Sequence, residues 1–458
     1  MEQAASPATD YQIAARIERL PLSRWHLKIL IPIGTGWFFD AFDALAIAYV
    51  LPVLIGLWKL APSQIGTLIA IGYLGQVIGS IFFGWLAEKI GRVPCTIYTL
   101  SLFSVMSFIA AFAWDFQSLA TIRFIQGIGL GGEIPIMATY IGEFANSKRR
   151  GRFALGYQLL FTIGLLFTGL AGVWVVPTFG WQWMFVIGAL PALIAIPLRW
   201  LLPESPRWLA SRGRFQEADA VLSKIEAEIS ENGARPLPPI PANVPPVVPA
   251  TTKFSSLLKG QYLRRSLTVW AIWFCSYSVV YGLSTWMPSI FRTVYQVSVQ
   301  QSVNIGFMLS IAGVIGALIA VTSIDFVGRK PLFAAGQLLS AVPLLILAFS
   351  GNLGLDTVRM LVIAGFFFIT WLAISLSTYT AELYPTEMRA LGCGVGNAWL
   401  RFASVIGPYM VGAILPTAGI SSVYLMFGAF ALVGGIVTLL FAVETRGRVL
   451  EELSPALR

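Results

Sequence analysis

Residues 84–92 read GWLAEKIGR, and the same order of acid, glycine and arginine returns at 324–330 as IDFVGRK. The offset between the two stretches is 237 residues. Another acid repeats at nearly the same distance, since Glu143 returns as Glu382 after 239 residues. Several charged elements repeating at one spacing indicate a duplicated structural unit.

The repeated stretches lie between long apolar segments. Hydrophobic residues make up 57% of the chain and charged residues 12%, whereas a soluble domain carries about 25% charged residues. A segment of about 20 apolar residues is long enough to cross a bilayer. The sequence therefore predicts an all-α membrane protein whose twelve transmembrane helices form two six-helix halves related by a pseudo-two-fold axis. The expected spans are 27–55, 63–87, 93–113, 117–142, 152–175, 181–202, 265–290, 301–324, 331–350, 358–382, 389–414 and 421–443.

The spans divide the chain into five parts. A hydrophilic segment, which contains the proline-rich run PLPPIPANVPPVVP, separates the two halves. The expected parts are an N-terminal tail at 1–26, the first half at 27–202, a linker at 203–264, the second half at 265–443 and a C-terminal tail at 444–458.

The net charge of +9 is explained by membrane topology rather than by nucleic-acid binding. Basic residues gather in alternate loops, as in the run Lys148, Arg149 and Arg150. This positive-inside bias places both termini in the cytoplasm. We expect the protein to lie in a bacterial-type inner membrane. We also expect a monomer, because one chain supplies a complete transmembrane pathway.

The repeated acids and arginines suggest a gate at the cytoplasmic rim. Ion pairs there are expected to hold the two halves together when the site faces outward, and the alternative is that these residues are topogenic anchors only. The glycines are expected to permit close helix approach and a tight turn. The gate residues are Gly84, Glu88, Gly91, Arg92, Glu143, Arg150, Asp325, Gly328, Arg329, Glu382 and Arg389.

Charged side chains also occur within the apolar spans, at a cost of roughly 2.5–3.5 kcal/mol each. Asp40 and Asp43 are three residues apart and so share one helix face. Together with Glu133 in the fourth span they are candidates for proton coupling, and the alternative is hydrogen bonding to neighbouring helices. Arg401 lies about twelve residues into the eleventh span, roughly 18 Å along it and near the bilayer midplane. Its guanidinium suits bidentate carboxylate binding, either to a substrate or to Asp40, Asp43 or Glu133.

These motifs resemble the major facilitator superfamily over residues 25–450. GWLAEKIGR matches its loop signature, and the RFIQG stretch that begins at Arg123 matches its fourth-helix motif. PESPRW, ELYPTEMRALG and ETRGRVLEEL are similar to the branch of sugar porters, synaptic vesicle protein 2 and organic ion transporters. The superfamily links Arg123 to proton handling, although a structural pair with Asp115 or Asp40 remains open.

Within this branch the sequence is most similar to bacterial niacin transporters and aromatic-acid:proton symporters. The seventh span, WAIWFCSYSVVYGLSTWMP, lacks the glutamine and asparagine signature of sugar porters. Organic anion carriers have arginine in the eleventh helix, where Arg401 falls. The stretch from Asp40 to Asp43 is similar to the Asp-Gly-x-Asp motif of aromatic-acid symporters, with Ala41 in place of the glycine.

The resemblance also implies that the first, fourth, seventh and tenth spans line a central cavity. Aromatic side chains there would stack on a planar ring, and a fifth-helix glutamine contacts substrate in sugar porters. The expected substrate residues besides Arg401 are Trp37, Tyr157, Gln158, Trp273, Tyr277, Tyr281 and Trp371.

The sequence thus predicts a secondary transporter that imports a small aromatic monocarboxylate with protons, not an enzyme. The alternatives are a sugar or polyol symporter and an organic cation or drug carrier of the same fold. No GxxxxGK[ST] nucleotide motif occurs. The three cysteines and His26 show no metal-ligand spacing, so no cofactor or metal is expected.

Overall fold

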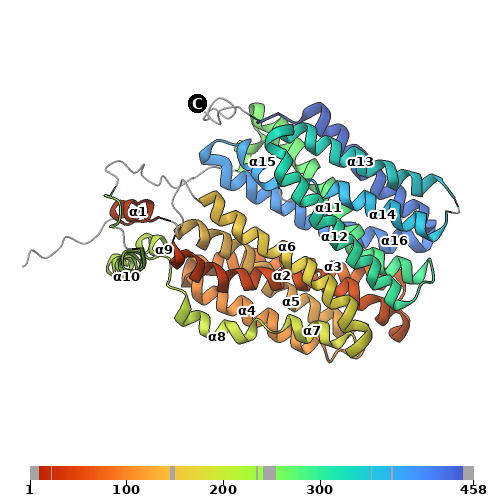
Figure 1. Ribbon diagram of the computed structural model, residues 1–458, viewed down its shortest axis with the longest axis horizontal. Helices are drawn as coiled ribbons and strands as arrows, with labels where there is room; N and C mark the ends of the chain where they lie inside the picture. The colour runs from red at the N-terminus through yellow and green to blue at the C-terminus, as the bar shows by residue number, and fades with distance from the viewer. Residues whose placement is uncertain are drawn as a thin grey trace, which may run out of the picture.

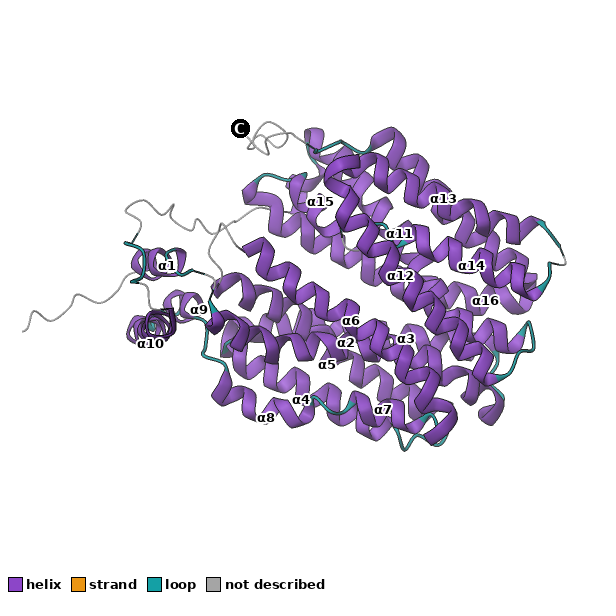
Figure 2. Cartoon of the chain, viewed as in Figure 1, coloured by secondary structure: helices purple, strands orange, loops and turns teal. Residues whose placement is uncertain are grey.

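The computed structural model describes residues 10–21, 23–144, 150–233, 236–240, 254–351, 353–372 and 375–446. Over these residues the regular structure is helical and contains no strand (Figure 2). The prediction of an all-α protein is confirmed. Eight of the described helices are long and apolar enough to cross a membrane.

The N-terminal half is the lower bundle in Figure 1, drawn red to yellow-green. In it α3 packs against α5, α2 against α6, and α4 against both α5 and α8. The helices are α2 (Arg24–Trp58), α3 (Pro62–Ile90), α4 (Arg92–Ala110), α5 (Phe116–Phe144), α6 (Arg150–Phe179), α7 (Gln182–Gly188) and α8 (Ala192–Leu201).

The C-terminal half is the upper bundle, drawn green to blue. Here α16 packs along both α11 and α13, and α14 packs against α12 and α13. The helices are α11 (Gly260–Thr293), α12 (Val299–Val327), α13 (Arg329–Phe349), α14 (Leu355–Ile369), α15 (Leu376–Glu382) and α16 (Thr386–Phe441). Gly419 interrupts α16 with a φ of 76°, and this break separates the last two predicted spans. The predicted spans at 181–202 and 358–382 are each divided into two shorter helices.

Close backbone contact between α3 and α5 fixes the centre of the N-terminal half. A Cβ built on Gly79 would lie 1.9 Å from the carbonyl oxygen of Ile128, and one on Gly131 would lie 2.0 Å from that of Gln76. Small residues are the usual means of close helix packing in membranes, where lipid gives little hydrophobic drive for association. The glycines therefore hold Gln76 and the side chains of α5 at a fixed depth.

The remaining helices lie together at one end of the bundles, which we call the linker side (left in Figure 1). α1 (Asp10–Glu18) packs against α9 (Pro206–Ser211) and α10 (Phe215–Gly233), and the 3-10 helix η1 (Phe254–Leu258) leads into α11. The described part of the expected linker contains α9 and α10 but also the first turn of α11. Most of its proline-rich run lies outside the described residues.

The two halves meet through α2 with α11, α3 with α16, and α6 with α12. On the side opposite the linker, Tyr49 and Ser310 hydroxyls are 3.3 Å apart. Gly66 of α3 also approaches Gly412 of α16, since a Cβ on Gly66 would lie 3.2 Å from the Cα of Gly412. The two halves are therefore in direct contact on the far side.

Charge pairs clamp α1 onto α10. Arg16 forms ion pairs with Asp219 and with Glu226, the latter at 3.0 Å, and Arg19 lies 2.7 Å from Glu226. Burial acts to raise the pKa of Glu226, but the hydrogen bonds and charges of the two arginines outweigh it and hold the pKa below its ordinary value of 4.5. A carboxylate with a lowered folded-state pKa stabilises the docked form above the unfolded-state pKa. This stabilisation is lost as the pH falls through the folded-state value.

We expect Glu226→Gln to release α1 at neutral pH, because both arginines lose their shared partner. Protection of the amides of residues 10–19 against hydrogen exchange, relative to the intrinsic rate at the same pH, should fall in the variant at neutral pH, and in the wild-type protein only as the pH falls below about 4.5. Glu217→Gln is the control, since Glu217 pairs with Arg214 at the start of α10 and not with α1. Equal exchange of α1 in both variants would contradict the clamp.

Candidate functional site

Ionisable side chains gather in the interior of the N-terminal half. Asp40 and Asp43 on α2, and Arg123 and Glu133 on α5, are each at most 4% exposed. Burial of ionised groups is costly unless they are paired or hydrogen-bonded. The partners of each group therefore distinguish charges that stabilise the fold from charges that are available to bind a ligand or a proton.

Asp43 and Arg123 form a closed network with Gln126. Arg123 Nη1 donates to both Asp43 carboxylate oxygens, at 2.9 and 2.8 Å, and to Gln126 Oε1 at 3.0 Å. Gln126 Nε2 donates to Asp43 Oδ1 at 2.7 Å. The network ties α2 to α5 and commits Asp43 to a fixed partner.

This pairing corrects the two partners considered for Arg123 from sequence. The partner is Asp43, not Asp40 or Asp115. Asp115 instead accepts a hydrogen bond from the Ser118 backbone N–H at 2.7 Å, at the start of α5. Sequence spacing alone did not separate Asp40 from Asp43, because both lie on one helix face.

Asp40 and Glu133 are buried without such partners. Within the described residues, Asp40 Oδ1 and Glu133 Oε2 have no hydrogen-bond partner. Glu133 crosses from α5 to α2, where a Cβ on Gly36 would lie 2.0 Å from Glu133 Oε1. Arg401 and Asp43 are the charges that act electrostatically on Asp40, and Asp40 acts on Glu133. The two carboxyl groups thus form one electrostatically linked pair beside the Asp43 network.

Arg401 is partly exposed and lies about midway between the start of α16 and its break at Gly419. It donates a hydrogen bond to the side-chain oxygen of Gln76 on α3, and so joins the two halves. Within the described residues no carboxylate lies within the 4.0 Å of an ion pair from its guanidinium. The predicted alternative of a structural ion pair with Asp40, Asp43 or Glu133 is therefore not observed.

Gln76 was not identified from the sequence. The available signal was a glutamine inside the otherwise apolar stretch IAIGYLGQVIGSIF. Its side chain is 2% exposed, and a buried amide needs a hydrogen-bonding partner. The missing information was the partner helix, which lies in the other half.

Aromatic rings follow one face of α11 toward the boundary between the halves. Trp273 stacks on Tyr277 with ring centroids 5.1 Å apart, and Tyr277 contacts Tyr281 at 5.9 Å. Tyr281 meets Tyr73 of α3 edge to face at 5.2 Å. Trp273 is fixed by donating from Nε1 to Thr380 Oγ1 at 3.0 Å. The series therefore reaches from the C-terminal half to the N-terminal half.

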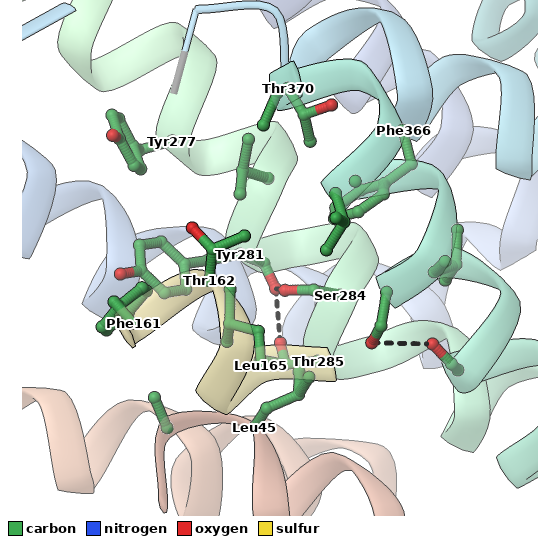
Figure 3. Close-up of a pocket in the computed structure, with 18 of the residues that line it drawn as sticks. Leu45, Phe161, Thr162, Leu165, Tyr277, Tyr281, Ser284, Thr285, Phe366 and Thr370 are labelled. Carbon is green, nitrogen blue, oxygen red and sulfur yellow. Dashed lines mark hydrogen bonds between the residues drawn. The ribbon is translucent and has the colours of Figure 1, made fainter. Parts of the chain in front are cut away.

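A cavity of about 140 Å³ lies at this boundary (Figure 3). Its wall combines the tyrosines with apolar and hydroxyl side chains and, in the described residues, includes no charged side chain. Arg401 nevertheless acts electrostatically on Tyr73 and Tyr281, which line the cavity. The polar members of the wall are Tyr73, Thr162, Tyr277, Tyr281, Ser284, Thr285, Ser310 and Thr370.

Of the predicted substrate residues, Tyr277 and Tyr281 line this cavity and Trp273 stacks behind them. Trp37 and Trp371 do not line it. The Trp37 ring packs on Phe161 at 4.7 Å, and the Trp371 ring packs on Phe368 at 5.4 Å. The side chains of Tyr157 and Gln158 lie outside the described residues.

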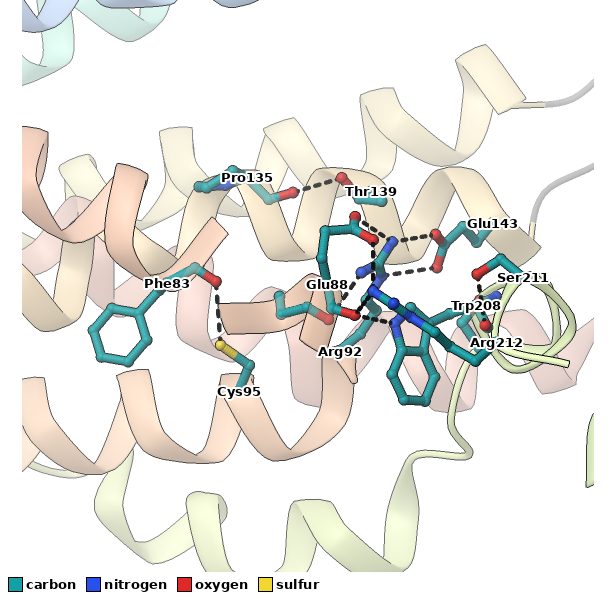
Figure 4. A network of polar contacts seen from close by, with 12 residues as sticks. Phe83, Glu88, Arg92, Cys95, Pro135, Thr139, Glu143, Trp208, Ser211 and Arg212 are labelled. Carbon is teal, nitrogen blue, oxygen red and sulfur yellow. Dashed lines mark hydrogen bonds and ion pairs between the residues drawn. The ribbon is translucent and has the colours of Figure 1, made fainter. Parts of the chain in front are cut away.

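On the linker side, the predicted gate residues form two matching clusters. In the N-terminal half, Arg92 lies 2.9 Å from Glu88 and 3.0 Å from Glu143 (Figure 4). In the C-terminal half, Arg329 lies 3.0 Å from Asp325 and 3.1 Å from Glu382. Each pair stays within one half in this structure, and no ion pair of the described residues joins the halves.

Backbone geometry repeats along with the charges. Gly91 and Gly328 have φ of 107° and 103°, a region that glycine adopts without strain. Glu204 then accepts from the Arg92 backbone N–H at 3.0 Å, and Glu444 accepts from that of Arg329 at 3.1 Å. A carboxylate at a helix N-terminus satisfies free N–H groups and complements the helix dipole.

Three gate residues differ from this pattern. Gly84 permits no close helix approach here, because a Cβ on it would meet nothing within 4 Å. Arg389 donates to the carbonyl oxygen of Ala381 at 3.0 Å rather than to a carboxylate. The Arg150 side chain lies outside the described residues.

Two helical bundles around a central polar site define a membrane transporter of the major facilitator fold. The xylose transporter of E. coli in its inward-open conformation superimposes with a TM-score of 0.70 over 93% of this chain and 99% of that chain, at 18% identity. The model of the family described as sugar (and other) transporter matches residues 29–457, and the chain belongs to this family. The predicted resemblance is confirmed, and the chain is a transport protein rather than an enzyme.

Curated relatives of the chain include transporters named for niacin. The niacin transporter of Acinetobacter baylyi is 33% identical over 451 residues, which are 96% of this chain and 99% of that protein. A putative niacin/nicotinamide transporter of Bacillus subtilis is 28% identical over 93% of this chain and 98% of that protein.

We expect Arg123→Ala to lower the free energy of unfolding by about 3–5 kcal/mol, because it leaves Asp43 buried without its partner. Thermal unfolding of the detergent-purified protein measures the change. Asp43→Ala/Arg123→Ala should recover part of the loss. Arg359→Ala, which breaks the more exposed pair with Asp356, should leave the midpoint unchanged. A normal midpoint in Arg123→Ala would show that the pair does not stabilise the fold.

Proposed function

We propose that this protein imports a small aromatic monocarboxylate, of the nicotinate or benzoate type, together with a proton. The observation that carries the proposal is Arg401, a partly exposed guanidinium without a carboxylate partner among the described residues, which acts electrostatically on two tyrosines of the aromatic cavity at the boundary of the halves. The niacin transporters among its relatives support the same substrate class.

The proposed arrangement has twelve spans in the two halves at 27–202 and 265–443, with both tails and the 203–264 linker in the cytoplasm of a bacterial inner membrane. Arginine-rich loops on the linker side support this orientation. In this orientation the halves touch on the far side, and their charge clusters stay separate on the cytoplasmic linker side. This arrangement corresponds to an inward-facing state. One chain forms the whole pathway and works as a monomer.

In this proposal the substrate carboxylate binds Arg401 through two parallel hydrogen bonds. The ring occupies the cavity and stacks among Tyr73, Tyr277 and Tyr281. A closed apolar cavity of about 150 Å³ in another protein accommodates benzene, so a cavity of about 140 Å³ suits one aromatic ring.

Asp40 is the proposed proton carrier. Asp43 is committed to Arg123, whereas Asp40 has a free carboxyl oxygen and lies within the electrostatic influence of Arg401. Substrate charge on Arg401 and proton occupancy on Asp40 are therefore coupled. One proton carried with one monoanion moves no net charge, so the membrane potential does not oppose uptake.

Proteoliposomes should take up labelled nicotinate faster with an inward proton gradient than without it, and excess benzoate should block the uptake. Arg401→Ala removes the carboxylate contact and should reduce uptake at subsaturating substrate roughly a hundredfold. Arg401→Lys keeps the charge but loses the planar pair of N–H donors, and should retain part of the activity.

Competition by glucose or a quaternary ammonium, with no effect of benzoate, would contradict the substrate assignment. It would then favour the sugar or organic cation alternative.

Asp40→Asn should abolish the stimulation by the proton gradient, because the amide cannot carry a proton. Exchange of external for internal nicotinate should continue, since it needs no net proton movement. Glu133→Gln is the matched control, a second buried carboxyl on which Asp40, but not Arg401, acts electrostatically. Loss of stimulation in Glu133→Gln but not in Asp40→Asn would assign the proton to Glu133.

A further inference from the structure

The contact between Gln76 and Arg401 crosses the boundary between the halves. Gln76 comes from α3 and Arg401 from α16, and these helices pack against each other. Gln76 is 2% exposed and is held at its depth by the close approach of its backbone to Gly131. Its side-chain oxygen is therefore presented to the guanidinium by a rigid helix pair.

Gln76 contacts the Arg401 guanidinium in the way that a substrate carboxylate would. An amide oxygen accepts from a guanidinium N–H in the same geometry as one carboxylate oxygen, but without the charge. The two buried glutamines differ in their partners: Gln126 lies between an arginine and an aspartate that already pair with each other, whereas Gln76 accepts from Arg401, which has no carboxylate partner among the described residues. Arg401 thus has an internal neutral ligand.

We propose that Gln76 is an internal competitor of the substrate carboxylate for Arg401 and must be displaced when substrate binds. This inference rests on the proposed function, since it takes an anion at Arg401 as the substrate contact. A carboxylate displaces the amide because its charge-assisted hydrogen bonds to arginine are stronger. The exchange also removes the hydrogen bond between α3 and α16, so substrate binding acts directly on the contact between the halves.

If Gln76 competes with the substrate for Arg401, removing its side-chain amide should strengthen substrate binding. A residue that contacts substrate weakens binding when it is removed, whereas an internal competitor strengthens it. Gln76→Met keeps the side-chain length and leaves only a weak acceptor. The dissociation constant of nicotinate should fall, by roughly tenfold for a hydrogen bond to a charged group. That of nicotinamide should fall by the same factor, because the competitor opposes every ligand of Arg401 equally.

Gln76→Glu tests the same idea in the opposite direction. A glutamate would pair with Arg401 as a full anion and compete more strongly than the amide. Nicotinate binding should weaken at pH 7.5 and recover as the pH is lowered and the new carboxyl takes up a proton.

The matched control is Gln337→Met. Gln337 is also fully buried, but it donates to Ser276 at 2.7 Å and accepts from Thr438 at 2.9 Å, all within the C-terminal half. Its replacement removes a buried glutamine without touching the boundary. Nicotinate affinity should stay at the wild-type value.

The experiment is equilibrium binding of labelled nicotinate to purified full-length protein, with nicotinamide as competitor, for the wild-type and the three variants. Tighter binding of both ligands to Gln76→Met alone supports the inference. Weaker binding would make Gln76 a direct substrate contact, and unchanged binding would make it structural; either overturns the inference while the proposed function stands. If the wild-type protein binds neither nicotinate nor benzoate, the proposed function fails and the inference fails with it.

Discussion

The central constraint on this molecule is the cost of holding charge inside a membrane. The Asp43–Arg123 pair meets it by pairing opposite charges, and Gln126 adds a hydrogen bond to each partner. The pair joins α2 to α5 at a place where α3 and α5 are already in backbone contact. This carboxylate and guanidinium neutralise each other, whereas the other ionisable groups of the candidate site have no ion-pair partner among the described residues. Asp40, Glu133 and Arg401 are the groups left for ligands and protons.

The second organising feature is the repetition of one device on the linker side. A glycine with positive φ ends a helix, an arginine begins the next, and a distant glutamate accepts from its backbone. The guanidinium then pairs with an acid one turn earlier and with another acid more than fifty residues away along the chain. Two such clusters with nearly equal distances support a common origin for the two halves, and each makes its own half internally cohesive.

The sequence was sufficient for the fold class and the family, because apolar span length and the repeated charged loops are local features. It also located the buried acids and Arg401. It did not predict that Arg123 would select Asp43 over Asp40, since both carboxylates share a helix face and the choice depends on the angle between α2 and α5. It missed Gln76, whose role depends on a residue in the other half. The aromatic side chains were only partly assigned. Tyr277 and Tyr281 face the cavity, whereas Trp37 and Trp371 pack among phenylalanines, and composition does not determine which way a ring points.

The confinement of ion pairs to single halves has a mechanical consequence. When one bundle rocks against the other, the described ion pairs within each bundle can move intact with it. The electrostatic energy of those pairs is therefore nearly constant along such a motion. What changes is the weaker set of contacts across the boundary: the approach of Gly66 to Gly412, the Tyr49–Ser310 hydrogen bond and the polar contact at Arg401. The two halves therefore behave as nearly rigid bodies joined by weak contacts. A single small ligand bound between them can contribute a large share of the free energy that sets their relative orientation.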